Sequence, residues 1–110
     1  MNFNEYQEKS KKTDLGTVVK DSNLVYYVLG LCSEAGEVAG KIKKVYRDFD
    51  GDLNEENRKE IEKELGDVIW YLSQLCSKLG LDFNSVAEKN ISKLYSRHER
   101  KSLQGNGDNR

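Results

Sequence analysis

Two short stretches of this chain carry paired carboxylates at a spacing suited to metal binding. Glu34 and Glu37 form one pair, and Glu64 and Asp67 form the other. Residues three positions apart lie on the same face of a helix. Both pairs stand among apolar neighbours, where an uncompensated charge is costly. Carboxylates brought together repel one another, and a hard divalent cation is the natural compensation.

The two pairs are expected to meet because they lie equally far from a turn. The segment Asp48–Asp52 consists mostly of aspartate and glycine and predicts a turn between two helices. In an antiparallel hairpin about this turn, Glu34 lies level with Asp67, about 20 Å from the turn along the helix axis. Glu37 lies level with Glu64 by the same count. The spacing therefore predicts one cluster of four carboxylates.

Glycines accompany both pairs of carboxylates. Gly36 and Gly66 are at nearly the same height in the expected hairpin. A glycine inside a helix costs about 1 kcal/mol relative to alanine, and a close approach of the two backbones is a sufficient reason to keep it. Gly30 and Gly40 lie on the first of the two helices and are expected to serve packing.

The ligand types favour magnesium or manganese over iron. All four candidate ligands offer oxygen, which suits these hard cations. A di-iron bundle uses Glu-x-x-His pairs, whereas the one histidine, His98, is far from both motifs and is expected at the surface. A solvated, charged helix face is the competing interpretation of either pair alone. The matched height, the apolar setting and the neighbouring glycines favour the metal site.

The composition limits the other classes of function. A chain of 110 residues is long enough for one domain and too short for two. Its net charge of −1 argues against nucleic-acid binding driven by bulk charge. No apolar run is long enough for a membrane span, and no signal pattern is seen at the start, so a cytoplasmic location is expected. Cys32 and Cys76 fit no zinc spacing, and we expect both to be reduced thiols in the core.

Helical periodicity places these residues on long helices. We expect helices over about Ser22 to Tyr46, Glu55 to Leu79, Asn84 or Ser85 to Arg100, and a short one over Asn4 to Lys12. Asn54 is a suitable N-cap for the second long helix and Gly80 a suitable stop. The expected fold is all-α, an antiparallel helical hairpin plus further helices. Residues 1–101 form the expected domain, and residues 102–110 a polar tail that is not helical.

The sequence around both pairs resembles the MazG-like all-alpha nucleoside triphosphate pyrophosphohydrolases. The resemblance is carried by Leu-Cys-Ser-Glu-Ala-Gly-Glu-Val-Ala (31–39) and by Lys-Glu-Leu-Gly-Asp-Val-Ile-Trp-Tyr-Leu (63–72), and it extends over Tyr26–Arg97. It implies that Glu34, Glu37, Glu64 and Asp67 are the metal ligands and the catalytic residues. It also implies phosphate contacts for Lys93 and Arg97. Many members follow that arginine with Tyr-Pro, whereas this chain has His98-Glu99.

The resemblance implies a reaction in which a nucleoside triphosphate is hydrolysed to its monophosphate and pyrophosphate, in housecleaning of the nucleotide pool. Mg²⁺, or Mn²⁺, would bridge the phosphate oxygens and activate the attacking water. Glu34 or Glu37 is the candidate base. Tyr71 follows Asp67 by one helical turn and is a candidate for contact with the base or sugar, whereas core packing is expected for Trp70.

The stretch Leu24–Leu31 is apolar around most of its helix. A helix with several apolar sides must be buried on several sides, so we expect self-association as a dimer or tetramer. The expected assembly is an oligomeric helix bundle in which a neighbour contributes to the active site. The alternative is a non-enzymatic helical protein that binds a divalent cation or a partner helix. This alternative explains the apolar faces but not four carboxylates at matched height.

Overall fold

The computed structural model describes residues 1–15 and 23–110, and these ranges contain helices and no β-strand. The elements are α1 (Phe3–Ser10), the short 3-10 helix η1 (Lys11–Thr13), α2 (Asn23–Asp48), α3 (Glu55–Lys78) and α4 (Phe83–Glu99). The expected all-α class is confirmed. The predicted start of the first long helix, Ser22, lies outside the described residues. Among those described, none of the helices combines the length and hydropathy that crossing a bilayer requires.

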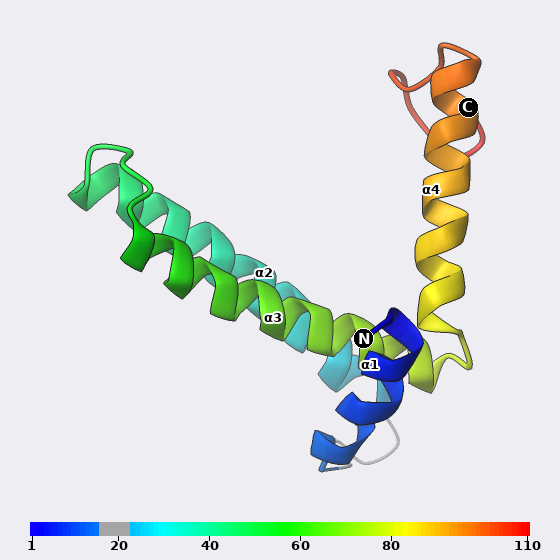
Figure 1. Cartoon of the computed structure of the whole chain (residues 1–110), viewed down its shortest axis with the longest axis horizontal. Helices are drawn as coiled ribbons and strands as arrows, with labels where there is room; N and C mark the ends of the chain where they lie inside the picture. The colour runs from blue at the N-terminus through cyan, green and yellow to red at the C-terminus, as the bar shows by residue number, and fades with distance from the viewer. Residues whose placement is uncertain (16–22) are drawn as a thin grey trace.

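Helices α2 and α3 form a long antiparallel hairpin (Figure 1). Asp50 and Gly51 in the connecting turn have positive φ, 53° and 79°, a conformation that aspartate tolerates and glycine adopts freely. Asn54 caps α3, as predicted, by accepting a hydrogen bond from the backbone N–H of Asn57. The apolar residues that are buried or partly buried along the two helices recur at helical spacing; they are Leu31, Val38, Ile42, Val45, Ile61, Val68 and Leu75.

A buried polar network holds α1 across the open end of the hairpin (Figure 1). The hydroxyl oxygens of Ser10 and Ser73 are 2.9 Å apart. Gln7 extends the network to the start of α4, because its Oε1 accepts the backbone N–H of Phe83 and its Nε2 donates to the carbonyl of Leu81, both at 2.9 Å. Buried polar groups satisfied in this way favour one arrangement of the elements they join.

Helix α4 begins at Phe83, one or two residues before the predicted start. Asp82 is the N-cap, and its carboxylate accepts the backbone N–H of Ser85 at 2.8 Å. Gly80, with φ of +68°, ends the preceding helix as predicted. From this junction α4 diverges from the hairpin (Figure 1). Residues 102–110 form turns and bends rather than helix, which confirms the prediction for that segment.

The single chain is open and leaves much apolar surface uncovered. Its radius of gyration is 16.9 Å, whereas about 13 Å is typical of a compact domain of this length. Within Leu24–Leu31 only Tyr27 is fully buried. The large apolar residues left exposed on the two long helices include Leu24, Val25, Val28, Leu29, Leu65, Ile69 and Leu72.

The two cysteines differ in their surroundings. Neither forms a disulfide; Cys76 is buried and Cys32 is exposed. The prediction of a core position is therefore confirmed for Cys76 and wrong for Cys32. The reason is rotational: Cys32 is one position beyond Leu31, which turns its side chain away from the inner face of the hairpin.

Candidate active site

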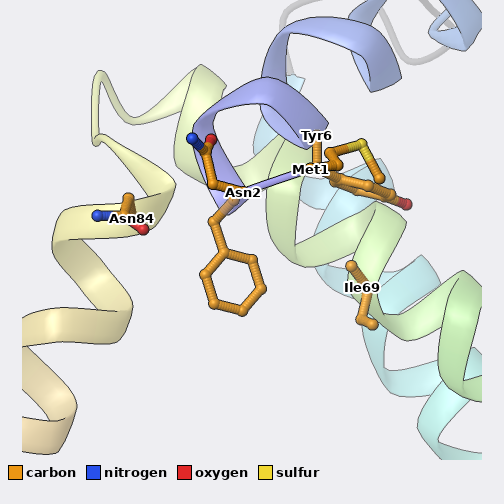
Figure 2. A pocket seen from close by; sticks show the side chains of 6 residues that line it. Met1, Asn2, Tyr6, Ile69 and Asn84 are labelled. Carbon is orange, nitrogen blue, oxygen red and sulfur yellow. The ribbon is translucent and has the colours of Figure 1, made fainter.

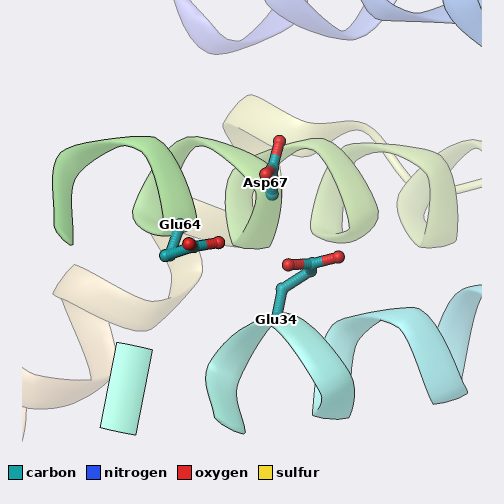
Figure 3. A group of neighbouring side chains, drawn as sticks. All are labelled: Glu34, Glu64 and Asp67. Carbon is teal, nitrogen blue, oxygen red and sulfur yellow. The ribbon is translucent and has the colours of Figure 1, made fainter. Parts of the chain in front are cut away.

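Three of the four predicted ligands meet between the two long helices. One carboxylate oxygen from each of Glu34, Glu64 and Asp67 lies within 4.8 Å of the other two. Figure 3 shows Glu34 reaching from α2 toward the two side chains on α3. Glu34 and Glu64 are partly buried and Asp67 is exposed, so the cluster opens to solvent on one side. Oxygens gathered this closely from two helices suit a divalent cation, which draws such ligands to about 2.0–2.6 Å.

Burial and the other carboxylates of the site raise the pKa of Glu34. Burial raises the pKa of its carboxyl group, and the charges of Asp67, Glu64 and Glu37 raise it further. Loss of hydration and like charges both disfavour the ionised form. Ionising all three carboxylates is therefore unfavourable in the absence of a counter-charge. A bound divalent cation would supply that charge and so stabilise the folded protein.

Glu37 lies alongside the cluster but outside its closest group. Its side chain is exposed, and its charge contributes to the raised pKa of Glu34. The predicted role of Glu37 as a fourth ligand stays a prediction.

Lys41 reaches the edge of the cluster from α2. Its Nζ lies 3.6 Å from an oxygen of Glu64 and 3.6 Å from an oxygen of Glu60. The ammonium group offsets part of the negative charge there. Lys41 was not among the predicted site residues, although the count that sets Glu34 level with Asp67 also sets Lys41 level with Glu60. The same count would have found it.

Gly30, rather than Gly36 or Gly66, marks the tight contact within the hairpin. A Cβ atom at Gly30 would lie 2.1 Å from Cε1 of Tyr71, whereas a Cβ atom at Gly36 or Gly66 would meet nothing within 4 Å. The predicted close approach at Gly36 and Gly66 is therefore wrong within one chain, because both lie on exposed faces of their helices. The packing role is confirmed for Gly30 but not for Gly40, which also faces open space.

Tyr71 stands beside the cluster in a group of aromatic side chains. A hydrogen bond with Tyr26, together with burial, raises the pKa of Tyr71 to about 12, and the charges of Glu34 and Asp67 add to the effect. The phenol is therefore within electrostatic reach of the carboxylates. Trp70 packs edge-on against Tyr71 with ring centroids 5.0 Å apart, in keeping with its expected packing role.

A pocket of about 420 Å³ lies between α1, α3 and the start of α4 (Figure 2). Its mostly apolar wall is formed by Met1, Asn2, Phe3, Tyr6, Ile69 and Asn84. Burial and the charge of Asp67 raise the pKa of the Tyr6 hydroxyl, which ties the pocket to the carboxylates. Tyr6 was not among the predicted site residues, because no spacing signal in the sequence indicates that α1 folds across α3.

Lys93 and Arg97 lie in the second half of α4, the part that diverges from the hairpin (Figure 1). Arg97 is 3% exposed and donates from Nη2 to the carbonyl of Asp108 at 2.6 Å. Lys93 Nζ lies 3.3 Å from the Asp108 carboxylate. Among the described residues of one chain, this basic pair therefore contacts the tail and not the carboxylate cluster. His98 is exposed, as predicted.

Comparison with known proteins identifies the family of this chain. The MazG nucleotide pyrophosphohydrolase domain matches residues 23–101, a range that includes both carboxylate pairs and the basic pair of α4. The Gene 37 protein of Mycobacterium phage L5 is 48% identical over 87 residues, which cover 79% of this chain and 76% of that protein. No solved structure matches the chain significantly. This chain belongs to the MazG nucleotide pyrophosphohydrolase domain family.

Proposed function

We propose that this protein is a metal-dependent nucleoside triphosphate pyrophosphohydrolase. It converts an NTP or dNTP to the monophosphate and pyrophosphate, and it serves the housecleaning of the nucleotide pool. The observation that carries the proposal is the meeting of Glu34, Glu64 and Asp67 between two helices, in a chain that belongs to the MazG family.

The chemistry of the donor set fits Mg²⁺, with Mn²⁺ as the second choice. All candidate ligands are carboxylate oxygens, which these hard cations prefer. Glu34, Glu64 and Asp67 would hold the cation, and Glu37 beside them would supply further oxygen. When bound, the cation neutralises phosphate charge and increases the acidity of water.

The carboxylates also supply a base. Glu34 is one candidate, through a carboxylate oxygen that the metal leaves free to accept the proton. Glu37, exposed beside it, is the other candidate. In the proposed reaction the base takes a proton from water while the water oxygen forms a bond to phosphorus. The anhydride bond between the α- and β-phosphates breaks, and its electron pair leaves with pyrophosphate.

The pocket between α1, α3 and the start of α4 is the proposed site of the nucleoside. Its volume of about 420 Å³ falls within the range of about 300–1,000 Å³ common for small-molecule sites. Phe3 and Tyr6 offer aromatic surface for stacking on a base, and the Asn84 amide can both donate and accept hydrogen bonds. Tyr71, also within electrostatic reach of the carboxylates, is a second candidate for contact with the base or sugar.

Self-association completes the site in this proposal. The accessible surface of the chain is 8270 Å², about 2,000 Å² more than a compact monomer of this mass exposes. Obligate dimer interfaces bury about 2,000 Å² or more in total. A second copy packed on the apolar faces of α2 and α3 would also occupy the open space at Gly36 and Gly66. It would bring its own Lys93 and Arg97 toward the phosphates.

The test is product analysis with a panel of nucleoside triphosphates in the presence of Mg²⁺. We expect monophosphate and pyrophosphate in equal amounts by ion-exchange chromatography. Glu64→Gln should lower turnover by about 100-fold or more, because the variant loses charge stabilisation in the transition state. Glu62→Gln is the matched control, since Glu62 is exposed on the same helix, and it should keep full activity.

Two outcomes would contradict the proposal. Release of orthophosphate and diphosphate would show a different reaction, and activity that survives a chelator would show that no metal is needed. Retained Mg²⁺ binding with no hydrolysis of any nucleotide would favour the alternative, a non-enzymatic helical protein that binds a cation.

A further inference from the structure

The segment 102–110, called here the tail, folds back onto the end of α4. The backbone N–H of Ser102 donates to the carbonyl of Arg97 at 2.7 Å, and Gly107 has a positive φ of 84° that lets the chain reverse. The Arg110 guanidinium closes the loop by donating to the carbonyl of Gly107 at 2.6 Å. The tail is therefore held by hydrogen bonds within itself and to α4.

Asp108 of the tail stands between the two basic side chains of α4. One oxygen of its carboxylate lies 3.3 Å from Lys93 Nζ and 3.6 Å from Arg97 Nη2. These two cations lower the pKa of the Asp108 carboxyl, the Lys93 hydrogen bond having the larger effect. An anionic oxygen shared by lysine and arginine is the same chemistry by which such a pair holds a phosphate oxygen.

The contact between Asp108 and the basic pair leaves one donor of Arg97 without a hydrogen-bond partner among the described residues. Arg97 is almost wholly buried, yet its Nε has no hydrogen-bond partner in the described part of the chain. A buried donor without a partner is costly and points to a missing ligand. By contrast, the Asp108 side chain is 86% exposed, and its ion pairs with Lys93 and Arg97 are therefore weak and easily displaced. Arg97 also donates to the backbone carbonyl of Asp108 at 2.6 Å, and this hydrogen bond does not depend on the carboxylate. A phosphate group, with more oxygens than a carboxylate, can satisfy more of these donors.

We propose that the tail is an internal competitor for polyphosphate at the Lys93 and Arg97 pair. Asp108 occupies the pair in the free protein, and the phosphates of a substrate or of pyrophosphate displace it. The inference rests on the proposed function only in assigning phosphate binding to this pair. It adds a regulatory contact, since the tail lowers the apparent affinity for anionic ligands.

Calorimetric titration of the 110-residue protein with inorganic tripolyphosphate tests the tail contact. A chelator is present so that no cation bridges the ligand to the carboxylate cluster. Asp108→Asn keeps the shape of the side chain and removes its charge. It should bind tripolyphosphate about two- to fivefold more tightly than the wild type, the range expected for loss of one exposed ion pair.

Two further variants test whether tighter tripolyphosphate binding in Asp108→Asn comes from the loss of its contact with Lys93. Asn109→Ala changes an exposed neighbour in the same tail and should bind tripolyphosphate as the wild type does. Lys93→Ala combined with Asp108→Asn should lose the gain, because the competing contact and the ligand use the same ammonium group.

The outcomes separate the tail contact from the enzymatic proposal. Unchanged or weaker tripolyphosphate binding in Asp108→Asn would overturn the inference, since the tail would then be neutral or part of the binding site. An equal gain in Asn109→Ala would also overturn it. Failure to hydrolyse any nucleotide would contradict the proposed function. The titration would still test the tail contact, because it measures binding and requires no catalysis.

Discussion

The ammonium nitrogen of Lys41 lies 3.6 Å from a carboxylate oxygen of Glu64, so α2 supplies both a carboxylate, that of Glu34, and a positive charge to the same cluster. Because both side chains are partly exposed, the attraction between them is worth about 1 kcal/mol or less. A divalent cation bound by Glu64 would be repelled by Lys41. The lysine therefore stabilises the metal-free cluster and would weaken the binding of a cation there.

Replacing Lys41 should strengthen metal binding. Lys41→Gln removes the competing charge, and we expect Mg²⁺ to bind about two- to fivefold more tightly in calorimetry. Lys43→Gln is the control because Lys43 is exposed on the same helix, and it should bind Mg²⁺ as the wild type does. Weaker binding in Lys41→Gln than in the control would contradict the proposed competition.

The pH dependence of stability should reveal the cost of ionising Glu34. Its pKa in the folded, metal-free protein is above the ordinary value of 4.5, so the folded state binds this proton more tightly than the unfolded state does. The resulting stability is fully present below pH 4.5 and is lost as pH rises through the folded pKa. With a chelator at pH 7, Glu34→Gln should therefore melt a few degrees above the wild type.

Two comparisons in the same melting experiment make this test specific. The difference should shrink as pH falls toward 4.5, and Mg²⁺ should raise the melting temperature of the wild type more than that of Glu34→Gln. Glu62→Gln, on an exposed face of α3, should show neither effect. Equal melting temperatures for the wild type and Glu34→Gln at pH 7 without metal would show that Glu34 carries no such cost.

The contact between Gly30 and the Tyr71 ring predicts opposite effects for two glycine substitutions. A methyl group at Gly30 would overlap the ring, so Gly30→Ala should lower the free energy of unfolding by about 1–3 kcal/mol. Gly40→Ala faces open space within the chain and should raise it by up to about 1 kcal/mol through helix propensity. Denaturant unfolding measures both, and a stabilised Gly30→Ala variant would contradict the described packing.

The helical hairpin and its three meeting carboxylates could be predicted from the sequence because both depend on fixed local geometry. The rise per residue is constant in a helix, so equal distance from one turn is enough to set Glu34 level with Asp67. Asn54 and Gly80 could also be predicted as helix ends. An asparagine side chain accepts a hydrogen bond from a nearby backbone N–H, and a glycine adopts positive φ, and both effects depend only on neighbouring residues.

Features that depend on long-range packing could not be read in this way. Spacing identifies residues that share a face but does not tell which face meets the neighbouring helix, and for this reason Gly36 and Gly66 were misjudged. The position of Tyr6 depends on the buried network around Gln7, which leaves no periodic trace in the sequence. The contact of Asp108 with α4 likewise requires a reversal of the chain that no sequence motif predicts.

The exposed apolar faces of α2 and α3 predict self-association. Light scattering should report a dimer or tetramer at micromolar concentration, and a clean monomer of 12.6 kDa would contradict it. Leu29→Glu, at a side chain that is 64% exposed in the single chain, should shift the protein toward monomer and reduce nucleotide hydrolysis. Lys43→Glu, which places the same charge on an exposed polar position of α2, should leave the assembly intact.

Complementation between two inactive variants would show that neighbouring chains share one site. Glu64→Gln lacks an intact carboxylate cluster, and Arg97→Gln lacks an intact basic pair; circular dichroism must first show that both are helical. If each site joins the cluster of one chain to the basic pair of another, a mixed dimer contains one fully intact site. Random mixing of subunits should then restore about a quarter of wild-type pyrophosphate release, because half of the dimers are mixed and each has one working site of two. If both groups act within one chain, the mixture should stay inactive, and Lys93 and Arg97 would have to reach the carboxylates by a movement of α4.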